Sequence, residues 1–171
     1  MLATSTGPID LAESGSVRRL RPDPCHEEMR VAEHQDPKQI VASFWKALYE
    51  RDFDKVATFF RADSTYTDIA TPPEDLAVGP EQVVARLRLG IERLDGYDHT
   101  VIGVTAEDGR VVTEHVEHWT WHTGEQVSFG FVSIHEVDGT TITRWTDYWD
   151  LQTLLSAAPG WWVEEIAAGY Q

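Results

Sequence analysis

Four long segments in the second half of this chain have the composition of β-strands, and they constrain the fold more than any other feature. They are rich in β-branched and aromatic residues, which favour extended backbone. Short turn signals, Glu107-Asp108-Gly109, Thr123-Gly124 and Asp138-Gly139, separate them. This spacing predicts an antiparallel meander. The four segments are residues 99–106, 110–122, 127–137 and 141–151.

Three helices are predicted before the meander. The first starts at Asp36-Pro37, a typical N-cap and first helical position, and continues with apolar residues at helical spacing. Residues 53–60 predict a short second helix, and residues 64–69 a strand. The third helix opens at Gly79-Pro80-Glu81 and carries Val83, Val84, Leu87, Ile91 and Leu94. Helices first and strands afterwards predict an α+β domain, with a strongly curved mixed or antiparallel sheet around the helices.

The domain organisation follows from length and local composition. A chain of 171 residues, 42% of them hydrophobic, has enough material for one domain with a proper core. Residues 1–35 are rich in Ser, Gly, Pro and charge, which predicts a disordered or loosely attached arm. We expect the domain at residues 36–155. The tail, residues 156–171, contains Trp161-Trp162, which would cover either a pocket or a partner subunit.

Charge and cysteine content exclude several classes of partner and location. The net charge of −15 argues against nucleic acid and anionic membranes, because each phosphate contact needs a Lys or Arg. The single cysteine, Cys25, excludes an intramolecular disulfide. No apolar run approaches the roughly 20 residues that span a bilayer, and the first residues lack the apolar core of a secretory signal. We therefore expect a cytoplasmic protein.

Two of the predicted strands place ionisable side chains among tryptophans. Alternate residues of a strand share a face, so His115 and Glu117 lie on one face, and Asp147 lies between two tryptophans on another strand. If both faces line one cavity, poor solvation would perturb the pKa values of these groups. Aromatic side chains would form the substrate-contacting walls. We expect these to be Trp119, Phe129, Phe131, Trp145 and Trp149.

A metal site is not expected among the histidines of these strands. The parity of the strand sends His118 and His122 to the face opposite His115. Zinc and iron sites need three or more convergent ligands, and His115 with Glu117 falls short of that number. We expect neither a metal nor a cofactor.

Three helices followed by a bent meander with polar groups inside resemble the nuclear transport factor 2-like fold over roughly residues 36–155. Within that superfamily the chain is most similar to limonene epoxide hydrolases. Their Thr-Glu-Arg-Val-Asp and Trp-Arg-Asp-Tyr-Phe-Asp-Leu strands are matched here by TEHVEH and WTDYWDL. The resemblance implies that Asp147 takes a proton from water, that Glu117 is the general acid and that Tyr66 orients the water. His115 replaces the family's central arginine, so we expect a relay from Glu117 through His115 to Asp147.

A second resemblance concerns Asp68, which stands where those hydrolases have an asparagine. A carboxylate abstracts the proton in ketosteroid isomerases and SnoaL-like polyketide cyclases. This resemblance implies that Asp68 is a base acting next to a carbonyl, with His115 or Tyr66 steadying the enolate. Alternatively, Asp68 caps a turn before Pro72-Pro73. A third hypothesis is a hydrophobic-ligand carrier without chemistry. Relatives commonly dimerise through the outer sheet face, which implies a homodimer that takes a small hydrophobic substrate.

Overall fold

Six strands form one curved sheet, which is the framework of the folded unit. The structure is a computed structural model that describes residues 35–69 and 75–169. The strand order is β2-β1-β6-β5-β4-β3; β1 runs parallel to β6, and all other neighbours are antiparallel. The predicted α+β class with a mixed sheet is confirmed. The strands are β1 (Thr65–Asp68), β2 (Ala77–Val78), β3 (Leu94–Glu107), β4 (Arg110–Trp121), β5 (Gln126–Asp138) and β6 (Thr141–Trp149).

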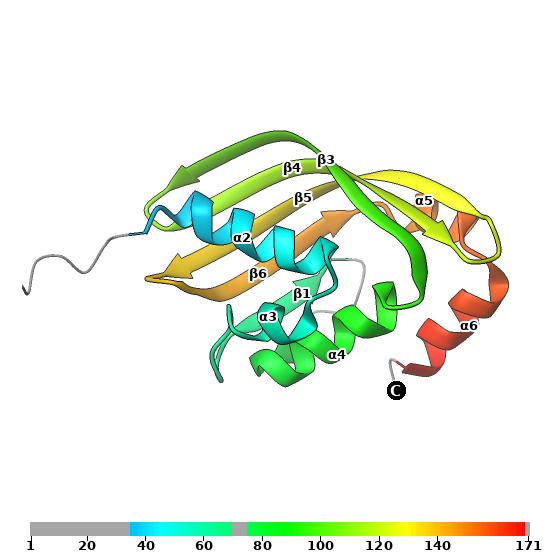
Figure 1. Ribbon diagram of the computed structural model, residues 1–171, viewed down its shortest axis with the longest axis horizontal. Helices are drawn as coiled ribbons and strands as arrows, with labels where there is room; N and C mark the ends of the chain where they lie inside the picture. The colour runs from blue at the N-terminus through cyan, green and yellow to red at the C-terminus, as the bar shows by residue number, and fades with distance from the viewer. Residues whose placement is uncertain (1–34, 70–74, 170–171) are drawn as a thin grey trace, which may run out of the picture. The chain divides into compact units, whose positions relative to one another are not determined.

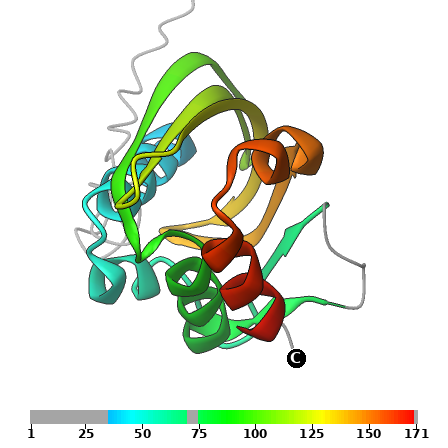
Figure 2. The ribbon, with the colours of Figure 1, turned by 90° about the vertical axis from the view of Figure 1, so that its right-hand side faces the viewer.

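The four long strands are strongly bent, and Figure 2 shows them curling around an interior that helices close. The register between β3 and β4 shifts twice, between Leu94 and Gly96 and between Val101 and Gly103. Such irregularities increase the bend and twist of a strand. Along β4 the inward-facing set from Val111 to Trp121 is buried at every second residue, as the alternation of the sequence predicts.

Three helices precede the long strands: α2 (Pro37–Tyr49), α3 (Phe53–Ala57) and α4 (Gly79–Ile91). The predicted start of the first helix at Asp36 is confirmed, because Asp36 Oδ1 accepts a hydrogen bond from the Lys38 amide at 3.0 Å. The second helix is shorter than predicted. Leu94 was expected in the third helix, but it is the first residue of β3 and pairs with Trp121. Within the described residues, no helix is long and apolar enough to span a membrane.

Two further helices, α5 (Leu151–Ala157) and α6 (Gly160–Gly169), follow the sheet. The last strand was predicted to reach Leu151 but ends at Trp149, because Asp150 caps α5 and accepts from the Gln152 amide at 2.9 Å. Helix α6 lies beside α4 (Figures 1 and 2), and the indole of Trp162 donates to the Gly90 carbonyl at 3.1 Å. The boundary predicted at residue 155 falls within α5, and the predicted arm, residues 1–35, lies outside the described residues except for residue 35.

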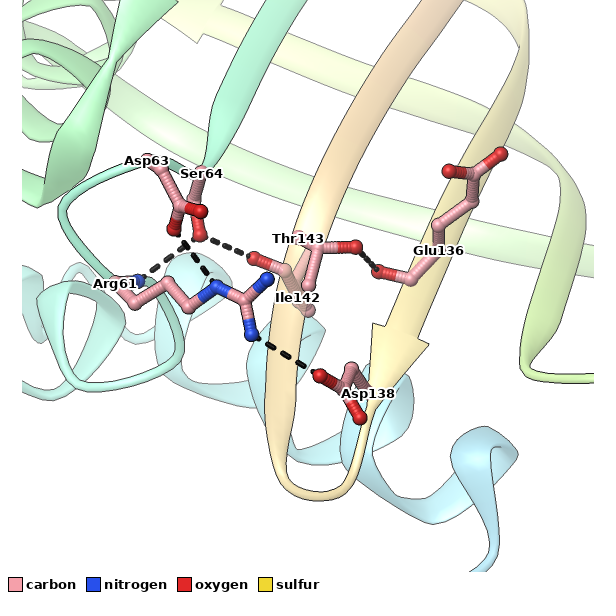
Figure 3. A network of polar contacts seen from close by, with 7 residues as sticks. All are labelled: Arg61, Asp63, Ser64, Glu136, Asp138, Ile142 and Thr143. Atoms are coloured by element: carbon pink, nitrogen blue, oxygen red, sulfur yellow. Dashed lines mark hydrogen bonds and ion pairs between the residues drawn. The ribbon is translucent and has the colours of Figure 1, made fainter.

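A polar network ties the loop before β1 to the β5–β6 hairpin (Figure 3). The Ser64 hydroxyl donates to the Ile142 carbonyl at 2.7 Å and accepts from the Arg61 amide at 2.9 Å. The Arg61 guanidinium reaches Asp63 at 2.7 Å and Asp138 at 3.0 Å. Because Ser64 directly precedes β1, this network holds β1 against β6 in their parallel pairing.

His135, on β5, is a fully buried core residue that the sequence did not single out. Its ring stacks on Trp145, with a centroid distance of 5.6 Å and an interplanar angle of 13°. Neither ring nitrogen has a hydrogen-bond partner among the described residues. Burial lowers the pKa of His135 from 6.5 to about 3, so the imidazole is neutral at pH 7.

We predict that the free energy of unfolding falls less between pH 7 and pH 4 in His135→Leu than in the unmodified protein. The unfolded chain takes up a proton at His135 below pH 6.5, whereas the folded protein does so only near pH 3. The contribution of the neutral His135 ring to the free energy of unfolding is therefore complete above pH 6.5. It is lost as the pH falls, by at most about 4–5 kcal/mol. Urea unfolding from pH 7 to 4 measures it, and His122→Gln, at an exposed position, is the control. Equal slopes in His135→Leu and the unmodified protein would contradict the prediction.

The β3–β4 turn gives a second prediction. Gly109 has φ +80°, and a Cβ there would lie 2.7 Å from the Val137 carbonyl oxygen. Gly124 has φ +100° with nothing within 4 Å of the same position, so it is the matched control. Gly124→Ala should cost about 1–2 kcal/mol of unfolding free energy from backbone strain alone. Gly109→Ala should lower the unfolding free energy clearly more, because the backbone must also shift. Equal losses of unfolding free energy in the two variants, measured by thermal unfolding, would disprove the clash.

Candidate active site

The parallel pairing of β1 with β6 brings two acidic residues side by side. In this register Asp68 lies opposite Asp147, and Tyr66 lies opposite Trp145. Asp68, Asp147 and Tyr66 are all buried. The Tyr66 hydroxyl donates to Asp68 Oδ1 at 2.8 Å and also lies 3.4 Å from Asp147 Oδ2. One phenol therefore bridges two carboxyl groups.

The two oxygens of Asp147 have different surroundings. Oδ1 accepts from the Ser133 hydroxyl at 2.5 Å and from the Trp145 indole at 2.6 Å. These donors occupy Oδ1, which leaves Oδ2, beside Tyr66, as the place for a proton. Burial, and then the neighbouring charge of Asp68, raise the pKa of Asp147 well above its ordinary value.

The pKa of Asp68 is also raised, chiefly by burial, but several groups oppose the rise. Hydrogen bonds from Tyr66 and from the Trp149 indole, which donates at 3.1 Å, favour the ionised form. The positive charge of Arg86 on α4 acts in the same direction. Because two adjacent buried carboxylates resist ionising together, Asp68 and Asp147 titrate as a pair, and the larger rise in pKa at Asp147 makes it the better place for a shared proton.

Glu117 forms a separate polar centre with its own donors. Its Oε1 accepts from the hydroxyls of Tyr49 at 3.1 Å and Tyr97 at 3.2 Å, and its Oε2 accepts from the Trp119 indole at 2.8 Å. Burial raises the pKa of Glu117 to about 7, although all three hydrogen bonds lower it. A carboxyl group with this pKa exchanges its proton near neutral pH.

The expected relay from Glu117 through His115 to Asp147 is not formed directly. The His115 Nδ1 has no partner among the described residues, and its Nε2 lies 3.5 Å from the Ser133 hydroxyl. Among the described residues, His115 therefore links to Asp147 through Ser133 and forms no hydrogen bond with Glu117. The imidazole is shorter than the arginine of the epoxide hydrolases, and it packs against Trp45 at 4.8 Å. Burial lowers the pKa of His115 to about 4, so it brings no positive charge to the site at pH 7.

The two carboxyl centres line one small cavity of about 70 Å³. Of the five predicted wall residues, Trp119, Phe131, Trp145 and Trp149 line it. Phe129 does not; it packs behind the wall, 5.2 Å from Trp119 and 4.9 Å from Phe131 between ring centroids. The cavity is smaller than the roughly 300–1,000 Å³ of pockets that hold drug-sized ligands. Its lining otherwise comprises Trp45, Tyr66, Asp68, Arg86, Leu87, Gly90, Ile91, Tyr97, Glu117 and Asp147.

Several residues of the site were not predicted from the sequence. Ser133 shares the inward phase of β5 with Phe131, so strand parity was a usable signal. Tyr97 lies before the predicted start of its strand, and Tyr49 belongs to the apolar residues expected at helical spacing in the first helix. Arg86 gave no signal, because a single arginine on a helix is ordinarily a surface residue. In the structure Arg86 lines the cavity and forms an ion pair with Asp75 at 2.5 Å.

Comparisons with solved structures find the same fold in several proteins. An LEH-like epoxide hydrolase from M. tuberculosis has a TM-score of 0.61 and 23% identity, covering 80% of this chain and 93% of that chain. A protein assigned as a SnoaL-like polyketide cyclase from Shewanella denitrificans has a TM-score of 0.63 and 19% identity over 71% and 95%. A hypothetical protein with a ketosteroid isomerase-like fold from Catenulispora acidiphila, in complex with trimethylamine, has a TM-score of 0.61 and 22% identity over 69% and 90%.

These likenesses establish the fold, and the sequence also matches a family model. The model describes a SnoaL-like domain and matches residues 41–145, which is more than half of the chain. The segment runs from α2 to β6 and includes Tyr66, Asp68, His115 and Glu117. The chain therefore belongs to the SnoaL-like domain family.

Proposed function

We propose that this chain is a cofactor-independent enzyme that moves a proton on a small, enolisable carbonyl compound. The Asp68–Tyr66–Asp147 bridge carries the proposal. It combines an ionised carboxylate, a neutral carboxylic acid and a phenol at the wall of one aromatic cavity. Proton transfer next to a carbonyl requires a general base and hydrogen-bond donors to the carbonyl oxygen, and these three groups supply them.

In this proposal Asp68 is the base. It removes a proton from the carbon next to the carbonyl, and the electron pair moves onto the carbonyl oxygen. The O–H groups of Asp147 and Tyr66 donate to the resulting enolate, whose charge they stabilise in a poorly solvated site. Asp68 then returns the proton to another carbon, so no water is consumed. The same first step serves a cyclisation in which the enolate attacks a second carbonyl.

Hydrolytic opening of an epoxide is the second candidate, and the position of Glu117 favours it. Its pKa of about 7 suits a general acid, and it shares the cavity with Asp147. However, that reaction needs Asp147 ionised as the base, and its raised pKa opposes this. His115 also supplies no charge to link the two carboxyl groups. We therefore rank proton transfer at a carbonyl first. Styrene and cycloalkene epoxides in ¹⁸O-labelled water test the hydrolase, which would form labelled diols.

The outer face of the sheet supports the expected homodimer as a further part of the proposal. Val132 and Tyr148 pair across β5 and β6 on that face and are 37% and 45% exposed. Exposed apolar side chains at the centre of a sheet are typical of an interface. Sedimentation velocity should give a dimer that Tyr148→Glu dissociates, and a monomeric unmodified protein would disprove this part.

The assignment of base and acid predicts unequal effects of two matched substitutions. With small cyclic ketones in D₂O, Asp68→Asn should lower deuterium incorporation by about 10²–10⁴-fold, because the base is lost. Asp147→Asn should lower it only about tenfold, because an amide still donates a hydrogen bond to the enolate. Mass spectrometry of the recovered ketone measures both effects. Glu114→Gln, on the outer face of β4, is the control and should exchange like the unmodified protein.

The opposite ranking would overturn the assignment. If Asp147→Asn abolished exchange while Asp68→Asn retained it, Asp147 would be the base, as the resemblance to epoxide hydrolases implies. A protein that exchanges no ketone and opens no epoxide, yet binds hydrophobic ligands tightly, would support the carrier hypothesis instead.

A further inference from the structure

The Glu117 end of the cavity contains a buried carboxyl group with only neutral partners among the described residues. These partners are two phenols and one indole N–H, from Tyr49, Tyr97 and Trp119. Buried carboxylates in proteins are normally paired with a cation, because burying an unpaired charge is costly. Glu117 avoids this cost by keeping a proton near neutral pH. A cation entering the cavity would remove the need for that proton.

The charges around the whole cavity also favour a bound cation. Among the described residues, three carboxyl groups line it, those of Asp68, Glu117 and Asp147. Arg86 is the one cationic side chain among the described lining residues, and it already forms an ion pair with Asp75. Outside the cavity, the net charge of −15 raises the local concentration of cations and disfavours anions.

The walls around Glu117 suit a particular kind of cation. Trp45, Tyr97, Trp119 and Phe131 supply aromatic rings to the same cavity. Aromatic faces attract organic ammonium groups through cation–π interactions, and this attraction grows where water is excluded. A volume of about 70 Å³ admits only a small molecule, so a ligand that carries both an ammonium and a carbonyl group there must be compact. An alkylated ammonium matches aromatic walls better than a hydrated inorganic ion does.

We propose that the Glu117 end of the cavity binds a small organic ammonium group, so that the substrate class is an ammonium-bearing carbonyl compound. The inference rests on the proposed function, because Asp68, Tyr66 and Asp147 act on the carbonyl part of the same molecule. Glu117 and the aromatic walls bind the cationic part and hold the reacting carbon at Asp68. Glu117 is thus a specificity-determining residue rather than an acid.

The pH dependence of cation binding follows from the groups that face Glu117. Tyr49 of α2, Tyr97 of β3 and Trp119 of β4 contact it, and Asp68, Asp147 and Arg86 of α4 line the same cavity. The phenol pKa values of both tyrosines are raised, so these groups stay neutral. Glu117, whose pKa is about 7, gains its negative charge between pH 6 and 8, so cation affinity should rise by up to about tenfold over this range.

Titration calorimetry with tetramethylammonium chloride tests the inference, because this ion keeps its charge at every pH. The comparison ligand is tert-butanol, a neutral molecule of similar shape. We expect tetramethylammonium to bind at least tenfold more tightly than tert-butanol at pH 8. Glu117→Gln should weaken the cation at least tenfold without affecting tert-butanol. Glu114→Gln removes one acidic charge from the outer face of the same strand and should change neither affinity by more than twofold.

Equal affinity for the two ligands in the unmodified protein would overturn the inference, whether or not Glu117→Gln folds. Undiminished cation binding by a folded Glu117→Gln protein would overturn it as well. The proposed function fails separately: in that case tetramethylammonium binds as expected, but ketones, including trimethylammonium ketones, exchange no deuterium. If ketones exchange deuterium but the protein binds tetramethylammonium no more tightly than tert-butanol, the inference alone fails.

Discussion

The hydrogen bond from an indole N–H to a buried carboxyl group is the interaction on which this site depends. In the part of the chain that the structure describes it occurs three times, from Trp119 to Glu117 at 2.8 Å, from Trp145 to Asp147 at 2.6 Å and from Trp149 to Asp68 at 3.1 Å. Each indole supplies a neutral donor and a large apolar surface together. Burial raises the pKa values of these acidic groups, and the indole donors orient the carboxyl groups while opposing part of that rise.

The curved sheet distributes these groups between two ends of one cavity. The β1–β6 pairing places Asp68 beside Asp147 with Tyr66 between them, and the network at Ser64 holds β1 in that register. Glu117 lies on β4 with phenols from α2 and β3. Proton transfer and cation recognition, as proposed, thus use different strands. The indole–carboxyl hydrogen bonds orient the carboxyl groups of both centres, as a site that works through prepositioned donors requires.

Several features of this arrangement were predictable because they follow from short-range periodicity. The burial of every second residue along β4, and with it the inward position of His115 and Glu117, follows from the two-residue period of a strand. The start of α2 at Asp36 follows from capping chemistry. Predictions at the ends of elements were wrong where tertiary contacts decided: Leu94 pairs with Trp121 in β3, and Asp150 ends β6 by capping α5.

The sequence by itself determined which residues face inward, the α+β class and the SnoaL-like family, because alternation, capping and local motifs act over a few residues. It did not determine which inward groups meet. Three features arise from tertiary packing: the contacts of Tyr66 with Asp68 and Asp147, the link from His115 to Ser133 rather than to Glu117, and the place of Arg86 in the lining. Only the tertiary structure fixes them, because they depend on strand order, parallel register and sheet curvature, which bring together residues far apart along the chain.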